Sequence, residues 1–214
     1  MKLLLISWLL FITACTPQAA SQQAITPIRN ISALHDLTEN VNKPFIVHPI
    51  PNNYSICYGH SCNKIGFVSL SEQEWHSITT LFSPIASSAE LEREQIKTAI
   101  ARLETYTGQY TGTSNDLAEN AISGGLSNAL DCIDEATNST VYLRMLQNAR
   151  LLHFHTQSHR LSRGGLVRPH NTASIIETAS NTRYAVDSWF GNNGEQPAII
   201  PLTLWKSGWK PKKN

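Results

Sequence analysis

The chain has 214 residues, of which 41% are hydrophobic and 15% are charged. This length allows one large domain or two small ones, and the apolar content is high enough to bury a core, which excludes a wholly disordered chain. Lys and Arg number 17 against 16 Asp and Glu. The sequence therefore lacks the excess of positive charge that sequence-independent binding to nucleic acid requires.

The first fourteen residues predict export. Lys2 is their only charge, and positions 3–12 are apolar apart from Ser7. The run is too short to cross a bilayer as a helix, and small residues follow it, as in a signal peptide.

The end of this segment, Ile-Thr-Ala-Cys at 12–15, resembles the lipobox of bacterial lipoproteins. The resemblance implies cleavage before Cys15, diacylglycerol on its sulfur and an acylated new N-terminus, and several acyl chains anchor a protein firmly. The alternative is an ordinary secretory signal followed by an incidental cysteine. Thr16 is not the usual inner-membrane retention residue of such lipoproteins. We therefore expect a periplasm-facing protein anchored in the bacterial cell envelope, with the outer membrane favoured.

The expected divisions are a signal peptide at 1–14, a lipidated N-terminus and flexible tether at 15–44, and a single domain at 45–214.

Three further cysteines follow, and an oxidising compartment changes what they predict. Cys57 and Cys62 lie five positions apart in a segment where Gly59 allows a tight turn, so a disulfide between them is feasible. The alternative is a metal site of Cys57, His60 and Cys62, but this spacing matches no common zinc motif and lacks an obvious fourth ligand. We favour the disulfide, which leaves Cys132 unpaired, and nucleophilic catalysis is one reason for an exported protein to keep a free thiol.

The order of the predicted elements indicates an α+β fold, with helices first and an antiparallel hairpin later. In the first half, strands are predicted at 45–50 and 64–70, and capping-box patterns at Ser71 and Ser87 open two helices. The remaining elements are a loop at 107–125, a helix from Asn128 or Asp131 towards Leu152, a loop at 158–169, and strands at 170–178 and 182–189.

Cys132 lies within the first turn of the third helix, whichever residue caps it. Amides exposed at a helix N-terminus favour a thiolate, and they also favour an oxyanion that forms on a substrate. A cysteine nucleophile needs a base and a group that orients the base. His170 opens the first strand of the hairpin and Asp187 lies in the second, so we predict a catalytic triad of Cys132, His170 and Asp187.

The hairpin loop decides whether His170 and Asp187 can meet. A four-residue loop at 178–181 pairs Glu177 with Thr182 and makes Asp187 the diagonal neighbour of His170 on one face, within reach of both side chains. A three-residue loop places them on opposite faces, and a two-residue loop separates them by roughly 13 Å. The sequence leaves the three loops open.

This order of residues resembles the transglutaminase-like superfamily of the papain-like fold. The resemblance is carried by Asp131-Cys132 at the helix, Pro169-His170-Asn171 at the first strand and the segment from Tyr184 to Trp189 at the second. It covers about 128–190, roughly a third of the chain. It implies a core of a helix packed on an antiparallel sheet, although the superfamily also contains members that have lost catalysis.

Three acidic residues surround the thiol, and their negative charge is unfavourable for a thiolate. Negative charge from Asp131, Asp134 and Glu135 would disfavour ionised sulfur and oppose the helix terminus. Either these carboxylates point to solvent, or His170 must contribute more of the activation.

Other groups allow a second interpretation. A histidine cluster offers a metal site, but we favour an irregular exposed segment because no clear carboxylate or thiol accompanies it (His153, His155 and His159). Three asparagines are candidates for an oxyanion-hole amide, and the sequence does not choose among them (Asn115, Asn120 and Asn128). Four aromatic residues either line a cleft or pack in the core (Trp189, Phe190, Trp205 and Trp209).

Together these features predict an exported, lipid-anchored thiol enzyme that acts on amide bonds. Its acyl-enzyme would be resolved by water, as in a peptidase or amidase, or by an amine, as in a transglutaminase. The expected partners are a peptide or a peptidoglycan stem peptide, inferred from location alone, and the membrane; we expect no nucleic acid, cofactor or metal. One alternative is a non-catalytic envelope lipoprotein that uses the same fold as a binding or assembly module, with Cys132 buried as a small hydrophobe. The other is a periplasmic protein that binds metal through the histidine cluster.

Overall fold

The computed structural model describes residues 45–120, 128–165 and 169–212. The predicted signal peptide, the lipidation residue Cys15 and the tether lie outside the described residues. Within the described ranges, no helix combines the length and the apolar character needed to cross a membrane.

The described part of the chain is an α+β fold with two antiparallel sheets, as the sequence predicts. The elements in chain order are β1 (Tyr54–Tyr58), β2 (Lys64–Val68), α2 (Glu72–Thr79), the 3-10 turn η1 (Thr80–Phe82), α3 (Ala89–Thr111), α4 (Cys132–Asn148), β3 (His155–Arg163), β4 (His170–Glu177), β5 (Arg183–Asp187), β6 (Ala198–Pro201) and α5 (Leu202–Lys206). Strands β1 and β2 form one sheet, and the other has the order β3-β4-β5-β6.

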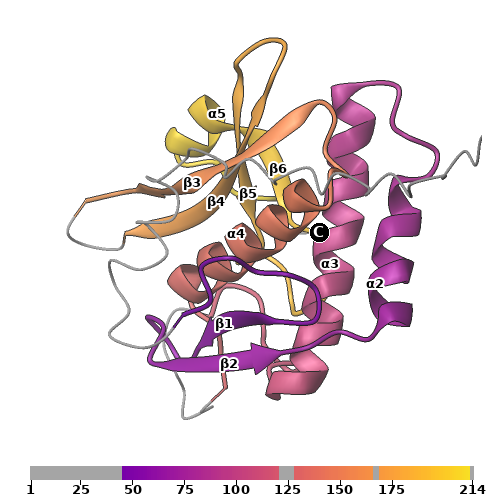
Figure 1. Ribbon diagram of the computed structural model, residues 1–214. Coiled ribbons are helices and arrows are strands. Elements are labelled where there is room, and N and C mark those ends of the chain that lie inside the picture. The colour runs from indigo at the N-terminus through magenta and orange to yellow at the C-terminus, as the bar shows by residue number, and fades with distance from the viewer. Residues whose placement is uncertain (1–44, 121–127, 166–168, 213–214) are drawn as a thin grey trace, which may run out of the picture.

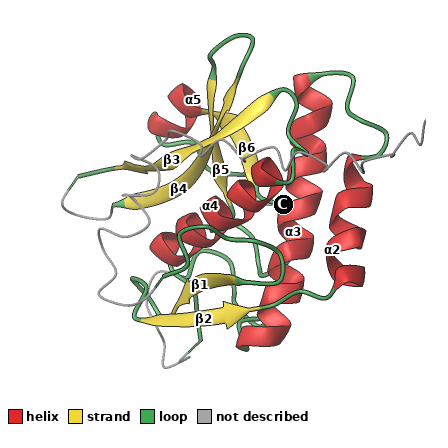
Figure 2. Cartoon of the chain, in the orientation of Figure 1, coloured by secondary structure: helices red, strands yellow, loops and turns green. Residues whose placement is uncertain are grey.

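Helix α4 is the centre of the molecule and lies between the two sheets (Figure 1). Its residues from Asp134 to Leu146 are all buried, because β1 covers one side and β3 and β4 cover another. Helices α2 and α3 lie beside each other and flank this central layer (Figure 2). The first turn of α4, which carries Cys132, is therefore held by elements from both halves of the chain.

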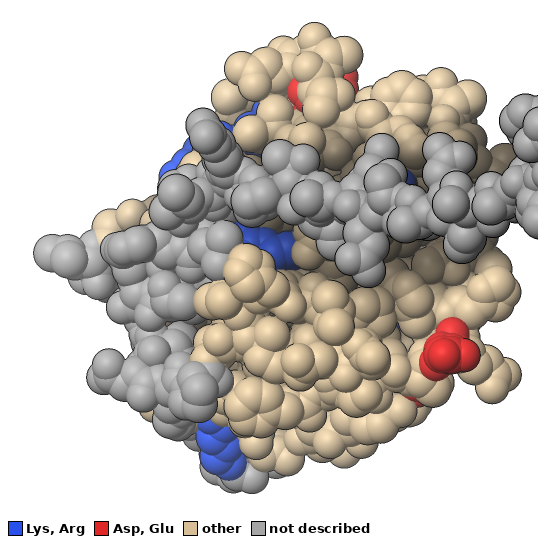
Figure 3. Space-filling view, viewed as in Figure 1, with Lys and Arg blue, Asp and Glu red and all other residues tan. Residues whose placement is uncertain are grey.

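One apolar core joins these layers. It includes Ile56 of β1, Ile100 and Leu103 of α3, Leu143 of α4 and Ile175 of β4, all with no exposed surface. Burying a side chain of this size stabilises the fold by about 1.5–3 kcal/mol before its entropy cost. The face in Figure 3 carries only scattered charged side chains among the described residues, in keeping with the balanced composition.

The helix starts follow the sequence signals closely. Ser71 caps α2 with a complete capping box, as predicted, since its hydroxyl accepts from the Glu74 amide and the Glu74 carboxylate accepts from the Ser71 amide. The cap of α3 is Ser88, whose hydroxyl accepts from the Leu91 amide, so the prediction of Ser87 is wrong by one residue. Helix α3 also runs to Thr111, beyond the predicted start of the loop at 107.

One strand prediction and one loop prediction are wrong. Residues 45–50 form no strand; Ile50 makes an isolated bridge with Asn53 across a turn that contains Pro51, and the strand begins at Tyr54 instead. The segment 158–169, predicted as loop, belongs in large part to β3. Strand β3 is polar in sequence and lies at the edge of its sheet, so it is defined by its pairing with β4 rather than by an apolar pattern of its own.

The predicted hairpin of β4 and β5 is present, with both strands ending earlier than expected. Its loop is the four-residue alternative, closed by a hydrogen bond of 2.9 Å from the Glu177 amide to the Thr182 carbonyl. Ala173 lies opposite Val186, and this register, continued by one residue, brings Asp187 opposite Thr172. Strand β6 and helix α5, which follow, have no counterpart among the predicted elements.

Candidate active site

Cys132 is the first residue of α4 and is half-buried. Asp131 is the N-cap, and its carboxylate accepts hydrogen bonds from the amides of Ile133 at 3.0 Å and Asp134 at 2.9 Å. Of the two predicted starting points of this helix, the structure therefore contains the one at Asp131. A sulfur at this position lies at the positive end of the helix dipole.

The His170 and Asp187 side chains are joined by a hydrogen bond of 2.7 Å between Nε2 and Oδ2. The indole Nε1 of Trp205 in α5 donates a second bond of 2.7 Å to the same carboxylate oxygen. Both partners of Asp187 are buried, as is Asp187 itself. The acid is thus fixed by a ring on each side, and it holds the imidazole through Nε2, which leaves Nδ1 as the nitrogen available to another group.

Aromatic rings enclose the imidazole of His170. Its ring centre lies 4.7 Å from that of Trp189, 5.4 Å from that of Phe190 and 5.6 Å from that of Trp205. Trp209 extends this group through Phe190, with ring centres 5.8 Å apart. These rings keep water away from the imidazole–carboxylate bond, which strengthens it.

The pKa of His170 is raised to about 9. Burial alone would lower it, since a buried cation is poorly solvated. The hydrogen bond and charge of Asp187 outweigh burial, and the Cys132 sulfur, near enough to interact with the imidazole, also raises the pKa. The imidazole therefore retains its proton at neutral pH, which is the charge state that accompanies an ionised sulfur.

Two polar groups of the segment around His170 approach the sulfur of Cys132. The thiol is 3.8 Å from the carbonyl oxygen of Pro169, which it can reach as a donor. The side-chain amide Nδ2 of Asn171 lies 3.7 Å from the sulfur, as a donor to it. Sequence reasoning placed Asn171 in the resemblance but gave it no role.

The three asparagines considered for an oxyanion hole have other positions. The amide of Asn120 donates to Asp116 at 3.3 Å, the amide of Asn128 donates to the Gly112 carbonyl at 3.3 Å, and Asn115 is exposed. No spacing rule in the sequence distinguishes Asn171 from them, because its place beside the sulfur depends on how β4 packs against α4.

Two of the three acidic residues near Cys132, Asp134 and Glu135, are buried and do not point to solvent, whereas Asp131 is half-buried. Burial raises the pKa of Asp134 to about 7, and the negative charge of Asp131 adds to this. Burial also raises the pKa of Glu135 well above its usual range, and Glu104 adds to the effect. A protonated carboxyl carries no charge, so these acids oppose an ionised sulfur less than their number in the sequence indicates.

The sulfurs of Cys57 and Cys62 are within disulfide distance, and their Cα atoms are 4.6 Å apart. Cys57 is the fourth residue of β1, and both of its backbone polar groups bind the side chain of Asn138 in α4, at 2.7 and 2.9 Å. The pair and Asp134 form the single group of possible metal ligands in the described ranges, and His60 is not part of it.

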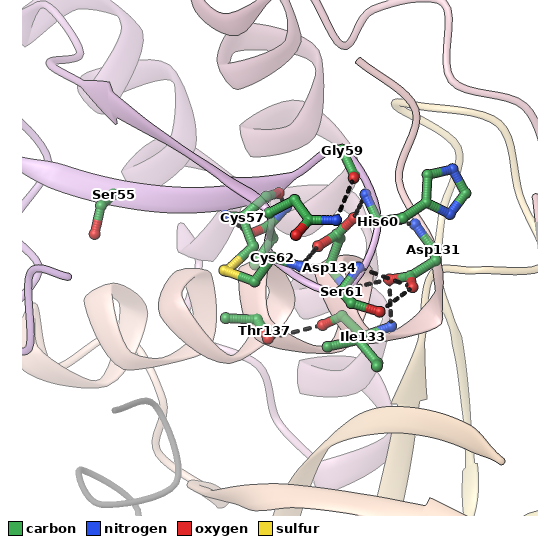
Figure 4. Close-up of a disulfide and its surroundings, with 12 residues drawn as sticks. Ser55, Cys57, Gly59, His60, Ser61, Cys62, Asp131, Ile133, Asp134 and Thr137 are labelled. Carbon is green, nitrogen blue, oxygen red and sulfur yellow. Dashed lines mark hydrogen bonds between the residues drawn. A yellow bond between two sulfur atoms is a disulfide. The ribbon is translucent and has the colours of Figure 1, made fainter. Parts of the chain in front are cut away.

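The turn between the two cysteines rests on the start of α4 (Figure 4). All four residues at 59–62 have positive φ angles, between 53° and 80°. The amides of His60 and Cys62 donate to the two oxygens of Asp134 at 2.9 and 2.7 Å, and the amide between them donates to Asp131 at 3.0 Å. The disulfide segment therefore helps to fix the helix end that carries Cys132.

The histidine cluster is neither gathered into one site nor irregular. His155 is buried in β3, where its Nδ1 lies 2.8 Å from Glu92 of α3. His153 is exposed before the strand, and His159 is half-buried within it. The prediction of an irregular exposed segment is therefore wrong, because pairing with β4 makes this segment a strand.

Comparisons with protein-family models, with curated proteins and with solved structures find no match to this chain.

Proposed function

We propose that the chain is an exported, lipid-anchored thiol enzyme that acts on amide bonds through Cys132, His170 and Asp187. The observation that carries the proposal is the bond of 2.7 Å between His170 and a buried Asp187, in a ring whose pKa is also raised by the sulfur of Cys132. A nucleophile at a helix start, a base and a group that orients the base are the parts that acyl transfer by cysteine needs.

The proposed reaction has two halves. Before the substrate binds, the proton of the Cys132 thiol is held by His170 as a thiolate–imidazolium pair. The sulfur attacks the carbonyl carbon, so that a carbon–sulfur bond forms and the carbonyl π pair moves to oxygen. When the tetrahedral intermediate collapses, the carbon–nitrogen bond breaks and the imidazolium protonates the leaving amine. Water or an amine then attacks the thioester carbon and gives a proton to the now neutral His170. The carbon–sulfur bond breaks, and the thiolate–imidazolium pair is restored.

The substrate class follows from the predicted location rather than from any specificity residue. We propose a peptide or a peptidoglycan stem peptide, which are amides accessible to a protein anchored in the cell envelope. The packing of α4 on the antiparallel sheet of β3 to β6 supports a papain-like, transglutaminase-like core.

Alkylation of Cys132 by iodoacetamide tests the proposal on the full-length protein. Without reductant, so that the Cys57–Cys62 pair stays closed, we expect the folded protein to be labelled by mass spectrometry at Cys132, and Cys132→Ser to lose this label. Labelling should be faster than for a small free thiol at the same pH, because the imidazolium and the helix start favour thiolate.

The contrary outcome is a Cys132 that is labelled only after unfolding. That result would contradict the enzyme and support the non-catalytic module, in which the sulfur serves as core packing.

A further inference from the structure

We infer that the side-chain amide of Asn171 and the backbone amide of Cys132 form the oxyanion hole of the enzyme proposed above. This inference rests on that proposed function and assigns a role to Asn171, which lies in β4 directly after His170.

Asn171 is placed towards the sulfur by the alternation of a strand. Successive side chains of β4 point to opposite faces. Ala173 and Ile175, which share the face of Asn171, lie in the apolar core that α4 helps to form, whereas His170 shares its face with Asp187. Nδ2 of Asn171 is thus brought to 3.7 Å from the sulfur of Cys132, and it has no other acceptor among the described residues.

The second donor is at the start of α4. The first amides of a helix have no partner within the helix. Asp131 binds the amides of Ile133 and Asp134 with its carboxylate and that of Glu135 with its carbonyl. The amide of Cys132 is left without a partner in the described ranges, directly beside the reacting sulfur.

The groups around the sulfur determine where the oxyanion of the tetrahedral intermediate lies. The oxyanion is bonded to the carbon that the sulfur attacks, so it lies two bonds from the sulfur. Donors of an oxyanion hole lie about 2.7–3.1 Å from that oxygen, which an amide 3.7 Å from the sulfur can reach. The Pro169 carbonyl, 3.8 Å from the sulfur, would repel a negative oxygen placed next to it. The oxyanion is therefore directed towards Asn171.

Two reagents separate this role from a role in thiol ionisation. Iodoacetamide reacts at a saturated carbon and forms no oxyanion, whereas p-nitrophenyl acetate acylates the sulfur through a tetrahedral intermediate. For Asn171→Ala we expect the first-turnover release of nitrophenolate to slow by about 10²–10³-fold, while alkylation at the same pH changes less than about twofold.

Two further variants guard the interpretation. Asn171→Leu keeps the size of the side chain without its donor, so it should show the same selective loss of acylation. It provides the test if Asn171→Ala does not fold. Asn148→Ala, at the exposed far end of α4, is the matched control and should leave both rates unchanged.

The possible outcomes distinguish failure of the thiol enzyme from failure of the oxyanion role of Asn171. A wild-type protein that reacts with neither reagent contradicts the proposed function itself. A reactive wild-type protein in which loss of Asn171 slows both reactions equally, or neither, overturns the oxyanion role and leaves the thiol enzyme standing.

Discussion

The part of the chain that the structure describes contains two buried pairs of a histidine and a carboxylate, and their hydrogen bonds are almost equal in length. His170 and Asp187 are 2.7 Å apart, and His155 and Glu92 are 2.8 Å apart. Both imidazoles come from the four-stranded sheet. Distance and burial therefore do not distinguish a catalytic pair from a structural one.

The second nitrogen of each ring makes the difference. Nε2 of His155 lies 3.2 Å from the guanidinium of Arg93, which also binds Glu177 at 2.9 Å. An arginine can only donate, so Nε2 of His155 serves as the acceptor of this contact and is not available to take a proton from another group. The second nitrogen of His170 is instead available to a thiol, which is an acid.

The two carboxylates also differ in the groups that donate hydrogen bonds to them. Glu92 accepts hydrogen bonds from the amides of three successive residues at the start of β3, at 2.6 to 3.1 Å, and thereby ties α3 to the sheet. Among the described residues, Asp187 accepts from the rings of His170 and Trp205 and from no backbone amide. A histidine–carboxylate pair thus predicts chemistry only when its remaining nitrogen faces a group that can give up a proton.

Replacing each histidine gives the sharpest test of this comparison. His170→Ala should lower the rate of acylation by p-nitrophenyl acetate by about 10²–10⁴-fold and remove the contribution of the imidazole to the pH profile of Cys132 alkylation, which then follows ionisation of the thiol alone. His155→Ala should leave both rates unchanged but destabilise the fold by about 2–4 kcal/mol, because it empties the space of a buried ring and removes one hydrogen bond each from Glu92 and Arg93. Urea unfolding measures the second effect, and equal losses of rate in both variants would remove the distinction.

Asp187→Asn tests whether the acid sets the charge of the imidazole. Without the carboxylate, burial lowers the pKa of His170 with less opposition, so we expect it to fall from about 9 to its ordinary value near 6.5 or below. Alkylation rates of Cys132 measured from pH 5 to pH 10 report the change as a shift of their midpoint. An unchanged midpoint would mean that Asp187 does not govern the ring.

The two pairs should also respond to pH in opposite directions. The pKa of Glu92 is lowered, because its hydrogen bonds to His155 and to backbone amides outweigh burial. Its contribution to stability is therefore present above pH 4.5 and lost as the pH falls through its lowered pKa. The pKa of His170 is raised, so its contribution is complete below pH 6.5 and lost as the pH rises to about 9.

Glu92→Gln measures the smaller of these effects. At pH 7 we expect a loss of about 1–3 kcal/mol in the free energy of unfolding, and this loss should shrink in strongly acidic buffer. Alkylation of Cys132 at pH 7 should be unaffected. A loss that is independent of pH would show that the charge of Glu92 is not what stabilises this region.

Local signals in the sequence reached part of the site. The cap at Asp131 and the position of Cys132 follow from residues next to each other. The meeting of His170 with Asp187 was one of three alternatives, and only the observed loop at 178–181 selects it.

What the sequence did not reveal depends on contacts between distant segments. Trp205 reaches Asp187 through a short helix that has no strong pattern, and Asn171 reaches the sulfur through the packing of a strand on α4. Glu92 of α3 binds His155, and the sequence of that helix does not indicate that Glu92 has a buried polar partner. The sequence does not predict strand β3, because its side chains are polar and the strand is defined by its pairing with β4.

The left-handed turn at 59–62 links the candidate site to the oxidation state of the chain. Non-glycine residues in this conformation cost about 1–2 kcal/mol each, and here three of them occur in succession. The cross-link and the carboxylates of Asp131 and Asp134 offset that cost. A polypeptide with both thiols reduced lacks the covalent half of this compensation, so the start of α4 is less firmly fixed in the reduced chain than in the oxidised one.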